Sequence, residues 1–302
     1  MNKTTILTLA LTVMLLAVGC HRQKHDSDLT DAQRLEMLDL QLEKHPKDAT
    51  LLAKRAKVLL NLHRTSEALF DINRAVTIDP DNVEYQLLKA DIHFASGDIQ
   101  GSYKALGEAE KLDPDSREVQ LKMGEVTFYS RDYERSLRHL TNVTEREPDN
   151  RTALFMKGFI YKEQGDTANA VVLLRRVCDI YPDYEPAFEE LGVLYAARGN
   201  ALAEEYLSTA MRLDPNNTNA CYAMAMYCQE SGQYDRAIEF YQHMLDINPA
   251  SADAWHNMGY IELTVNENYQ QALEYFDKAL QADSTHQAAA FNRDLTLQMI
   301  KK

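Results

Sequence analysis

The chain has 302 residues, 45% of them hydrophobic, and 46 acidic against 32 basic side chains give it a net charge of −14. This acidity excludes nucleic acid and anionic lipid headgroups as main partners, because both bind basic patches. An acidic surface most often serves solubility in secreted proteins, and attraction of a basic partner is the alternative.

Residues 1–19 have the pattern of a secretory signal peptide. Lys3 precedes an apolar run over residues 6–18 that is too short to span a bilayer but suits the hydrophobic segment of a signal. The sequence LAVGC at residues 16–20 resembles the bacterial lipobox. That resemblance implies cleavage before Cys20, which then carries a diacylglyceryl thioether and an N-acyl chain. The alternative is an ordinary secretory signal that ends near a cysteine.

Residues 20–29 are expected to be a flexible tether behind the lipidated Cys20. Two or more acyl chains anchor a protein firmly, so the acylated N-terminus is the expected contact with the bilayer. His21 and His25 lie beside this cysteine, but a flexible pair whose neighbouring thiol is consumed by lipid binds metal weakly. No metal site or cofactor is therefore expected.

Seven of the eight prolines recur at a nearly constant spacing, with gaps of 34, 34, 34, 34, 33 and 34 residues. They are Pro46, Pro80, Pro114, Pro148, Pro182, Pro215 and Pro249. Such a period is typical of stacked supersecondary units. We number each unit so that this proline is position 32, with a one-residue adjustment in units five and seven. Position 8 is then always Ala or Gly, and position 20 is always Ala or Ser. This predicts two helices that cross closely.

Each unit is predicted to be helix, turn, helix, turn. Position 24 supplies one large side chain per unit: Ile72, Leu106, Leu140, Leu174, Leu207, Tyr241 and Phe276. Glycine marks position 15 in four units, where a left-handed residue ends the first helix: Gly97, Gly165, Gly199 and Gly232. Proline stops the second helix, and an Asp or Asn after it can cap the next.

The expected boundaries follow from this register. A half-repeat covers 30–48 and a C-terminal capping helix covers 287–302. Between them lie seven units at 49–82, 83–116, 117–150, 151–184, 185–217, 218–251 and 252–286. The prediction is sixteen helices and no strand. The short gap before Pro215 places a shortened turn after Gly199 in unit five.

The recurring residues resemble the tetratricopeptide repeat family, whose unit carries Trp, Leu, Gly, Tyr, Ala, Phe, Ala and Pro at set positions. Unit seven supplies Trp255, Met258, Gly259, Ala272, Phe276 and Ala279, and unit four supplies Leu154, Gly158, Tyr161, Gly165, Ala170, Leu174 and Pro182. The resemblance covers residues 49–286 and implies an all-α, right-handed α-solenoid. The early units depart from it at Arg55, Lys89 and Arg146, which puts their local packing in question.

The resemblance also implies a binding surface, because the first helices of the family line the concave face and positions 5 and 9 point into its groove. Lys57, Asp91 and Glu125 make the N-terminal part charged, and the two acids break the family's carboxylate clamp. Units four to seven carry the candidate groove residues Phe155, Phe159, Tyr222, Met226 and Tyr260. Apolar and aromatic anchors of this kind bind a peptide or helix. The alternative is that they pack on a neighbouring unit or under the chain's own terminus.

Cysteines in the repeats are expected to be small core residues. Cys221 and Cys228 lie two turns apart on one helix, about 10 Å by helical rise, which exceeds disulfide reach. Cys178 sits at a packed position of a second helix. No disulfide is predicted.

The sequence lacks a phosphate-binding loop, an HExxH motif and zinc-spaced cysteine pairs, which favours a non-enzyme without a small-molecule substrate. The expected function is a membrane-anchored adaptor that binds a protein or peptide in the bacterial cell envelope. One alternative is a subunit of an envelope assembly or secretion complex, since the architecture resembles pilotin lipoproteins of type IV pilus assembly; an enzyme is a distant third. His21 after Cys20, where an aspartate would retain a lipoprotein in the inner membrane, favours the periplasmic face of the outer membrane over the inner membrane or the cell surface.

Overall fold

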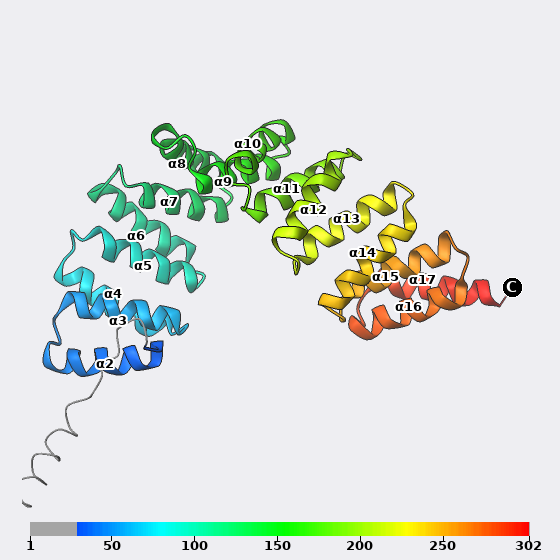
Figure 1. Ribbon diagram of the computed structural model, residues 1–302. Helices are drawn as coiled ribbons and strands as arrows, with labels where there is room; N and C mark the ends of the chain where they lie inside the picture. The colour runs from blue at the N-terminus through cyan, green and yellow to red at the C-terminus, as the bar shows by residue number, and fades with distance from the viewer. Residues whose placement is uncertain (1–28, 302) are drawn as a thin grey trace, which may run out of the picture. The chain divides into compact units, whose positions relative to one another are not determined.

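The computed structural model describes residues 29–301, which form sixteen α-helices and no strand (Figure 1). The predicted all-α class of paired, stacked helices is therefore confirmed for this part of the chain. The signal peptide, Cys20 and nearly all of the tether lie outside the described residues. No helix within residues 29–301 is long and apolar enough to cross a membrane.

The chain divides into two compact parts, which we call unit 1 (residues 1–130) and unit 2 (residues 131–302). Numerals denote these two parts throughout, and the words one to seven denote the repeat units. The described helices of unit 1 are α2 (Asp31–Lys44), α3 (Ala49–Asn61), α4 (Thr65–Ile78), α5 (Val83–Ala95), α6 (Ile99–Leu112) and α7 (Arg117–Tyr129). Those of unit 2 are α8 (Tyr133–Arg146), α9 (Arg151–Glu163), α10 (Thr167–Ile180), α11 (Glu185–Ala196), α12 (Leu202–Leu213), α13 (Thr218–Glu230), α14 (Tyr234–Ile247), α15 (Ala252–Thr264), α16 (Tyr269–Ala282) and α17 (Gln287–Ile300).

Side-chain caps start most of the described helices, and the predicted Asp or Asn after the repeat proline provides the cap of α3, α5, α9 and α13. Asn150 Oδ1 accepts a hydrogen bond from the Ala153 amide at 3.0 Å at the start of α9, and Asn217 does the same for Ala220 at 2.9 Å at the start of α13. Asp98, after the turn glycine, caps α6 through the Gly101 amide at 2.8 Å. Each such bond satisfies an amide that the first helical turn leaves without a partner.

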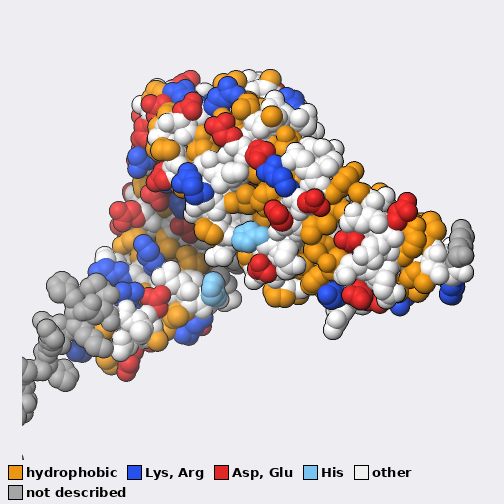
Figure 2. All heavy atoms as spheres, turned by 45° about the vertical axis from the view of Figure 1, so that its right-hand side comes forward, with side chains coloured by type: hydrophobic (Ala, Val, Ile, Leu, Met, Phe, Trp, Pro, Cys, Tyr) orange, Lys and Arg blue, Asp and Glu red, His pale blue; other side chains and the backbone are white. Residues whose placement is uncertain are grey.

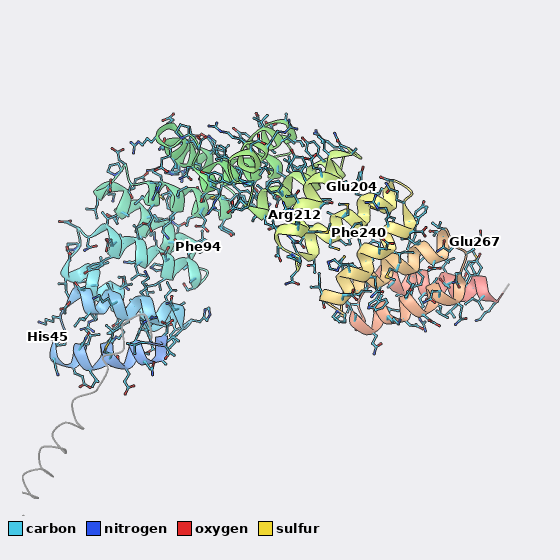
Figure 3. All side chains as sticks on the ribbon, in the orientation of Figure 1. His45, Phe94, Glu204, Arg212, Phe240 and Glu267 are labelled. Atoms are coloured by element: carbon cyan, nitrogen blue, oxygen red, sulfur yellow. The ribbon has the colours of Figure 1, made fainter. Side chains whose placement is uncertain are left out.

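Every unit turns between its two helices on a left-handed residue. The four glycines at position 15 have φ of 79°, 77°, 61° and 75°, as the sequence predicts. The other three units use His63, Arg131 and Glu267, with φ of 58°, 58° and 53°, and Glu267 is labelled at the α15–α16 turn in Figure 3. A left-handed non-glycine residue costs about 1–2 kcal/mol, so the packing of the flanking helices must impose this turn.

The predicted shortened turn after Gly199 is wrong, because residues 197–201 separate α11 from α12 whereas only residues 164–166 separate α9 from α10. Unit five accommodates its missing residue by shortening its helices. Its helices α11 and α12 have 12 residues each, whereas the first and second helices of the other units have 13 and 14. Its second helix begins after Ala201, which has no side-chain cap bond, and Asn200 Oδ1 instead accepts from the Leu202 amide at 2.9 Å. The irregular gap therefore changes the entry into α12.

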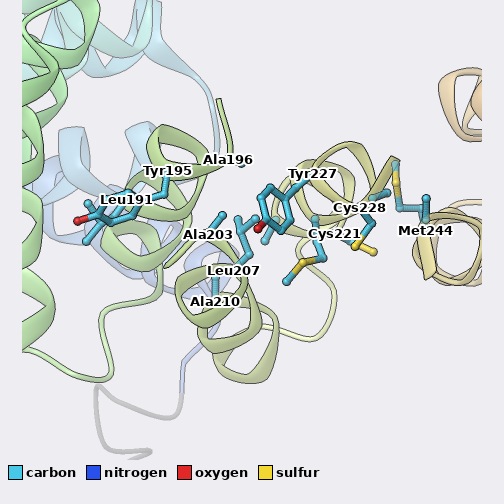
Figure 4. Close-up of a cluster of buried hydrophobic side chains, with 14 of the residues drawn as sticks. Leu191, Tyr195, Ala196, Ala203, Leu207, Ala210, Cys221, Tyr227, Cys228 and Met244 are labelled. Carbon is cyan, nitrogen blue, oxygen red and sulfur yellow. The ribbon is translucent and has the colours of Figure 1, made fainter. Parts of the chain in front are cut away.

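Close contact between paired helices explains the small and large positions. A Cβ added at Gly158 would lie 3.0 Å from Leu174, one at Gly259 would lie 2.8 Å from Phe276, and Leu174 and Phe276 are fully buried. In unit 2 a continuous core runs from Leu154 to Ile261, and Figure 4 shows part of it. The helices thus stack through one knob per repeat.

The three departures from the repeat pattern have different surroundings. Arg55 makes a bidentate pair with the buried Asp71 of α4, with N–O distances of 2.6 and 2.8 Å, so its charge is compensated inside unit 1. Lys89 is half-buried on α5, and Arg146 ends α8.

All three cysteines of the described residues are buried free thiols. Burial raises the pKa of Cys178 to about 12 and that of Cys221 to about 11. Loss of solvation disfavours the thiolate form of these cysteines, so they are unreactive residues of the core.

Candidate partner-binding face

The five predicted groove residues all lie on the first helices α9, α13 and α15 of unit 2. We call the surface formed by positions 5 and 9 of α9, α11, α13 and α15, with their immediate neighbours, the first-helix face. Tyr222 and Tyr260 are 36% and 42% exposed, and Phe155, Phe159 and Met226 are half-buried. Each of the five keeps part of its side chain in solvent. Phe155 and Met226 also rest against the core, Tyr222 meets the ring of Tyr241 on α14, and Phe159 contacts Phe155 and Lys162 of its own helix.

Three rings form the α9 cluster, which we define as Phe155, Phe159 and Tyr184. The Phe155 ring centroid lies 6.3 Å from that of Phe159 and meets Tyr184, at the start of α11, edge-on at 5.3 Å. Arg151 places its guanidinium 4.7 Å from the Tyr184 ring, and Lys162 places Nζ 5.0 Å from the Phe159 ring. The cations and the edge contact hold the rings in fixed positions.

A second group, the α13–α15 cluster, consists of Tyr222, Met226 and Tyr260. The Met226 sulfur accepts a hydrogen bond from the Tyr241 hydroxyl at 3.1 Å and lies 3.8 Å from Asn257 Nδ2. These two contacts hold the Met226 side chain in place. The tyrosines are the exposed part of this cluster.

Beside Tyr222 a shallow pocket of about 250 Å³ opens at the N-terminal ends of α13 and α15. Its lining is mostly polar: Thr218, Asn219, Tyr222, Met244, Asn248, Ser251 and Asp253. A pocket with an aromatic wall and several hydrogen-bonding groups can hold one polar side chain of a partner.

An acidic stretch of α11 separates the two apolar clusters. Asn217 Nδ2 donates to Glu185 Oε1 at 2.5 Å and to Glu189 Oε2 at 2.6 Å, and Lys162 pairs with Glu190 at 2.5 Å. Burial raises the pKa of Glu185 and of Glu190, and neighbouring carboxylates add to both shifts. Figure 2 shows hydrophobic and acidic side chains side by side on one face of the molecule.

Sequence reasoning missed Phe291, which is 69% exposed on α17. Continuing the repeat register beyond residue 286 places Phe291 at position 5, where Tyr222 stands in unit six. The capping helix packs against both α15 and α16, as a further first helix would. The aromatic row of the first-helix face therefore continues onto α17.

In unit 1 position 9 of the first helices is charged, with Lys57, Asp91 and Glu125, whereas position 5 is apolar. Asp91 pairs with Lys122 at 2.5 Å, and burial, with a smaller contribution from Asp91, raises the pKa of the Glu125 carboxyl. Within residues 29–301 no cluster of His, Cys, Asp and Glu side chains is arranged to hold a metal ion.

Two histidines attach α17 to α15. Asn292 Nδ2 donates to His256 Nε2 at 3.1 Å while His256 Nδ1 faces Asn257 Oδ1 at 3.0 Å. His286 Nδ1 accepts from the Ala289 amide at 3.1 Å, and its Nε2 faces Asp253 Oδ1 at 3.2 Å. A ring nitrogen can accept only when it carries no proton.

Acidification is therefore expected to loosen α17. Burial lowers the pKa of His256, opposed by Asn257 and Asp253 and assisted by His286. The unfolded chain then binds more protons below about pH 6.5, so the stabilisation is present above that pH and is lost as pH falls through the folded-state pKa. Amide exchange in α17, corrected for its intrinsic rate, should report a loss of about 1 kcal/mol, the net contribution of one hydrogen bond.

The matched variants are His256→Asn and His243→Asn, the latter on the exposed side of α14. The first should remove most of the pH dependence of exchange in α17, and the second should leave it unchanged. Equal pH dependence in both variants would contradict the role given to His256.

Comparison of the chain with protein-family profiles matches the tetratricopeptide repeat at residues 121–185, 194–258 and 252–286. No curated protein matches the chain. Among solved structures, YrrB, described as a TPR protein with an unusual peptide-binding site, is 22% identical with a TM-score of 0.54, over 64% of this chain and 99% of its own.

Two other solved structures are similar over a larger share of the chain. PilW, described as a widely conserved type IV pilus biogenesis factor, is 19% identical with a TM-score of 0.61, over 67% of this chain and 94% of its own. A tetratricopeptide repeat protein from Parabacteroides merdae is 15% identical with a TM-score of 0.60, over 82% of this chain and 98% of its own. At these identities the likeness concerns the fold.

Proposed function

We propose, from the premise that the chain is a tetratricopeptide repeat protein, that it is a non-catalytic scaffold whose first-helix face in unit 2 binds a protein or peptide partner. The observation that carries this proposal is the row of exposed aromatic side chains on successive first helices. Tyr222, Tyr260 and Phe291 are 36%, 42% and 69% exposed on α13, α15 and α17. Aromatic side chains left in solvent together are the usual anchors of interfaces.

Serine substitution tests this assignment. The purified full-length protein is used to select peptides from a random-sequence display, and the selected peptides are then measured against Phe159→Ser/Tyr260→Ser. Loss of two aromatic anchors should weaken binding at least tenfold, because a buried anchor contributes about 2 kcal/mol or more.

The matched control is Phe70→Ser/Val172→Ser, two apolar residues that are 65% and 66% exposed on the second helices α4 and α10. This control should bind the selected peptides like the parent protein. If the control loses binding and the first-helix variant keeps it, with both still folded, the proposed face is wrong.

Attachment to a bacterial envelope membrane through acylated Cys20 is part of the same proposal. It is supported by the signal-like segment 1–19 and by the lipobox-like residues 16–20, and His21 favours the periplasmic face of the outer membrane. Mass spectrometry of the mature N-terminus should find three acyl chains on Cys20, two in a diacylglyceryl thioether and one on the amino group. A processed but unmodified N-terminus would show that Cys20 does not anchor the protein to the membrane.

A second candidate is a subunit of an envelope assembly complex, favoured by the similarity in fold to PilW, which is described as a pilus biogenesis factor. An adaptor and an assembly subunit differ in what is recovered with them. Affinity capture from solubilised membranes should give one partner for an adaptor and a stable multi-subunit particle for an assembly component.

A further inference from the structure

Along the first-helix face of unit 2, from α9 to α15, the exposed side chains are first apolar, then acidic, then apolar again. The α9 cluster lies on one side, the acidic stretch of α11 in the middle, and the α13–α15 cluster on the other side. Successive first helices are direct neighbours here, since α11 contacts α13 and Tyr184 at the start of α11 touches Phe155 of α9. A segment laid across these helices meets the three zones in that order.

In the acidic stretch of α11, Glu185 and Glu189 are held in place, but only one oxygen of each carboxylate accepts a hydrogen bond. Asn217 gives one hydrogen bond each to Glu185 and Glu189, and its own Oδ1 is used to cap α13. No described residue donates a hydrogen bond to the other oxygen of either carboxylate. Glu190 differs, because Lys162 already pairs with it. Two carboxylate oxygens therefore remain available to a donor from outside.

A cation is the donor that suits this zone. Glu185 and Glu189 lie close enough to one Asn217 nitrogen for their charges to repel, and Asp214 and Glu190 add to the negative potential at Glu185. A positively charged group relieves this repulsion and at the same time fills the open hydrogen-bonding positions. The net charge of −14 assists the approach of such a partner.

We propose that the partner is an extended peptide segment with a Lys or Arg side chain midway between two large apolar side chains. The basic group binds between Glu185 and Glu189, and the apolar groups contact the α9 cluster and the α13–α15 cluster. This inference rests on the proposed function, which places the partner on the first-helix face.

The spacing within the segment follows from helix packing. Neighbouring helices pack about 8–10 Å apart, so α9 and α13, which flank α11, are separated by roughly 20 Å. An extended chain advances about 3.3 Å per residue, and about six residues cover that distance. The basic residue is then expected about three residues from each apolar anchor.

The test uses three synthetic peptides and the full-length protein. Each peptide has 11 residues (about the length of the span with two flanking residues at each end), with Phe at the two anchor positions and Ser or Gly elsewhere. The peptides differ only in the central residue, which is Lys, Gln or Glu. The Lys peptide should bind about tenfold more tightly than the Gln peptide, and the Glu peptide more weakly than both.

A charge-neutral variant identifies the residues responsible. Glu185→Gln/Glu189→Gln should bind the Lys and Gln peptides equally. The control Glu239→Gln/Glu274→Gln removes the same charge from exposed positions of the second helices α14 and α16 and should keep the tenfold preference. A preference that survives in the first variant, or disappears in the control, would overturn the inference.

The outcomes separate this inference from the proposed function. If all three peptides bind equally and Phe159→Ser/Tyr260→Ser abolishes their binding, the face is correct and the basic specificity is wrong. If no peptide binds, or if binding ignores Phe159 and Tyr260, the proposed face is wrong and the inference falls with it.

Discussion

Asp71→Ala is expected to lower the free energy of unfolding of unit 1 by about 3 kcal/mol. The Asp71 side chain is 2% exposed and accepts both nitrogens of the Arg55 fork at 2.6 and 2.8 Å. Removing the carboxylate leaves the Arg55 guanidinium half-buried with only Asp39, at 2.7 Å, as a partner. Taking the bidentate partner from a half-buried charge costs more than the pair itself contributes, because the buried part of the guanidinium is left without a hydrogen-bond acceptor. Urea unfolding followed by circular dichroism and by amide exchange in α3 and α4 measures the loss.

The double variant Arg55→Met/Asp71→Leu is the control for this prediction. Position 7, where Arg55 stands, holds Met123, Leu191, Met224 and Met258 in other units. Replacing both charged partners by apolar groups of similar volume should restore most of the lost stability. A double variant that is no more stable than Asp71→Ala would show that the ion pair does more than substitute for an apolar contact.

Gly192→Ala is expected to destabilise unit 2 by about 2–3 kcal/mol. A Cβ at this position would lie 2.7 Å from Leu207 Cγ and Cδ2 and 3.0 Å from the Leu207 backbone nitrogen. Because Leu207 is fully buried, neither its side chain nor α12 can move without disturbing the core. The single tryptophan, Trp255, lies in unit 2, so its fluorescence during urea unfolding reports the change.

Gly107→Ala makes the same chemical change where there is room. A Cβ at Gly107, inside α6, would meet no atom within 4 Å. Alanine has the higher helix propensity, so this variant should gain about 0.5–1 kcal/mol, measured in unit 1 by amide exchange. If both glycine variants shift stability in the same direction, close helix contact is not the reason for the small residue at position 8.

Sequence reasoning recovered the fold because the repeat imposes the same packing constraint many times. A small residue at position 8, a large one at position 24 and a stop at position 32 are each weak signals, but seven copies in phase define two helices per unit. The turn was predicted in every unit, but its left-handed residue could be predicted only in the four units that carry glycine there. His63, Arg131 and Glu267 adopt the left-handed conformation without glycine, so the residue type at these three positions does not indicate that conformation.

The candidate face was only partly predictable for a similar reason. Positions 5 and 9 identified Phe155, Phe159, Tyr222, Met226 and Tyr260 from the resemblance, but contacts between units decide which of them is exposed. The bonds from Asn217 join residues 28 and 32 positions apart, and Arg55 meets Asp71 across 16 positions. Phe291 was not predicted to lie on this face, because its helix was expected only to cap the stack.

Site-specific photo-crosslinking in the native cell tests the central claim most directly. A photoreactive phenylalanine analogue is placed at Phe159, Tyr222 or Tyr260 on the first-helix face, and at Phe70 or Val172 on the exposed second helices. A cross-linked partner is expected from the first three positions and none from the other two. Cross-linking from Phe70 or Val172, with none from the first-helix face, would contradict it.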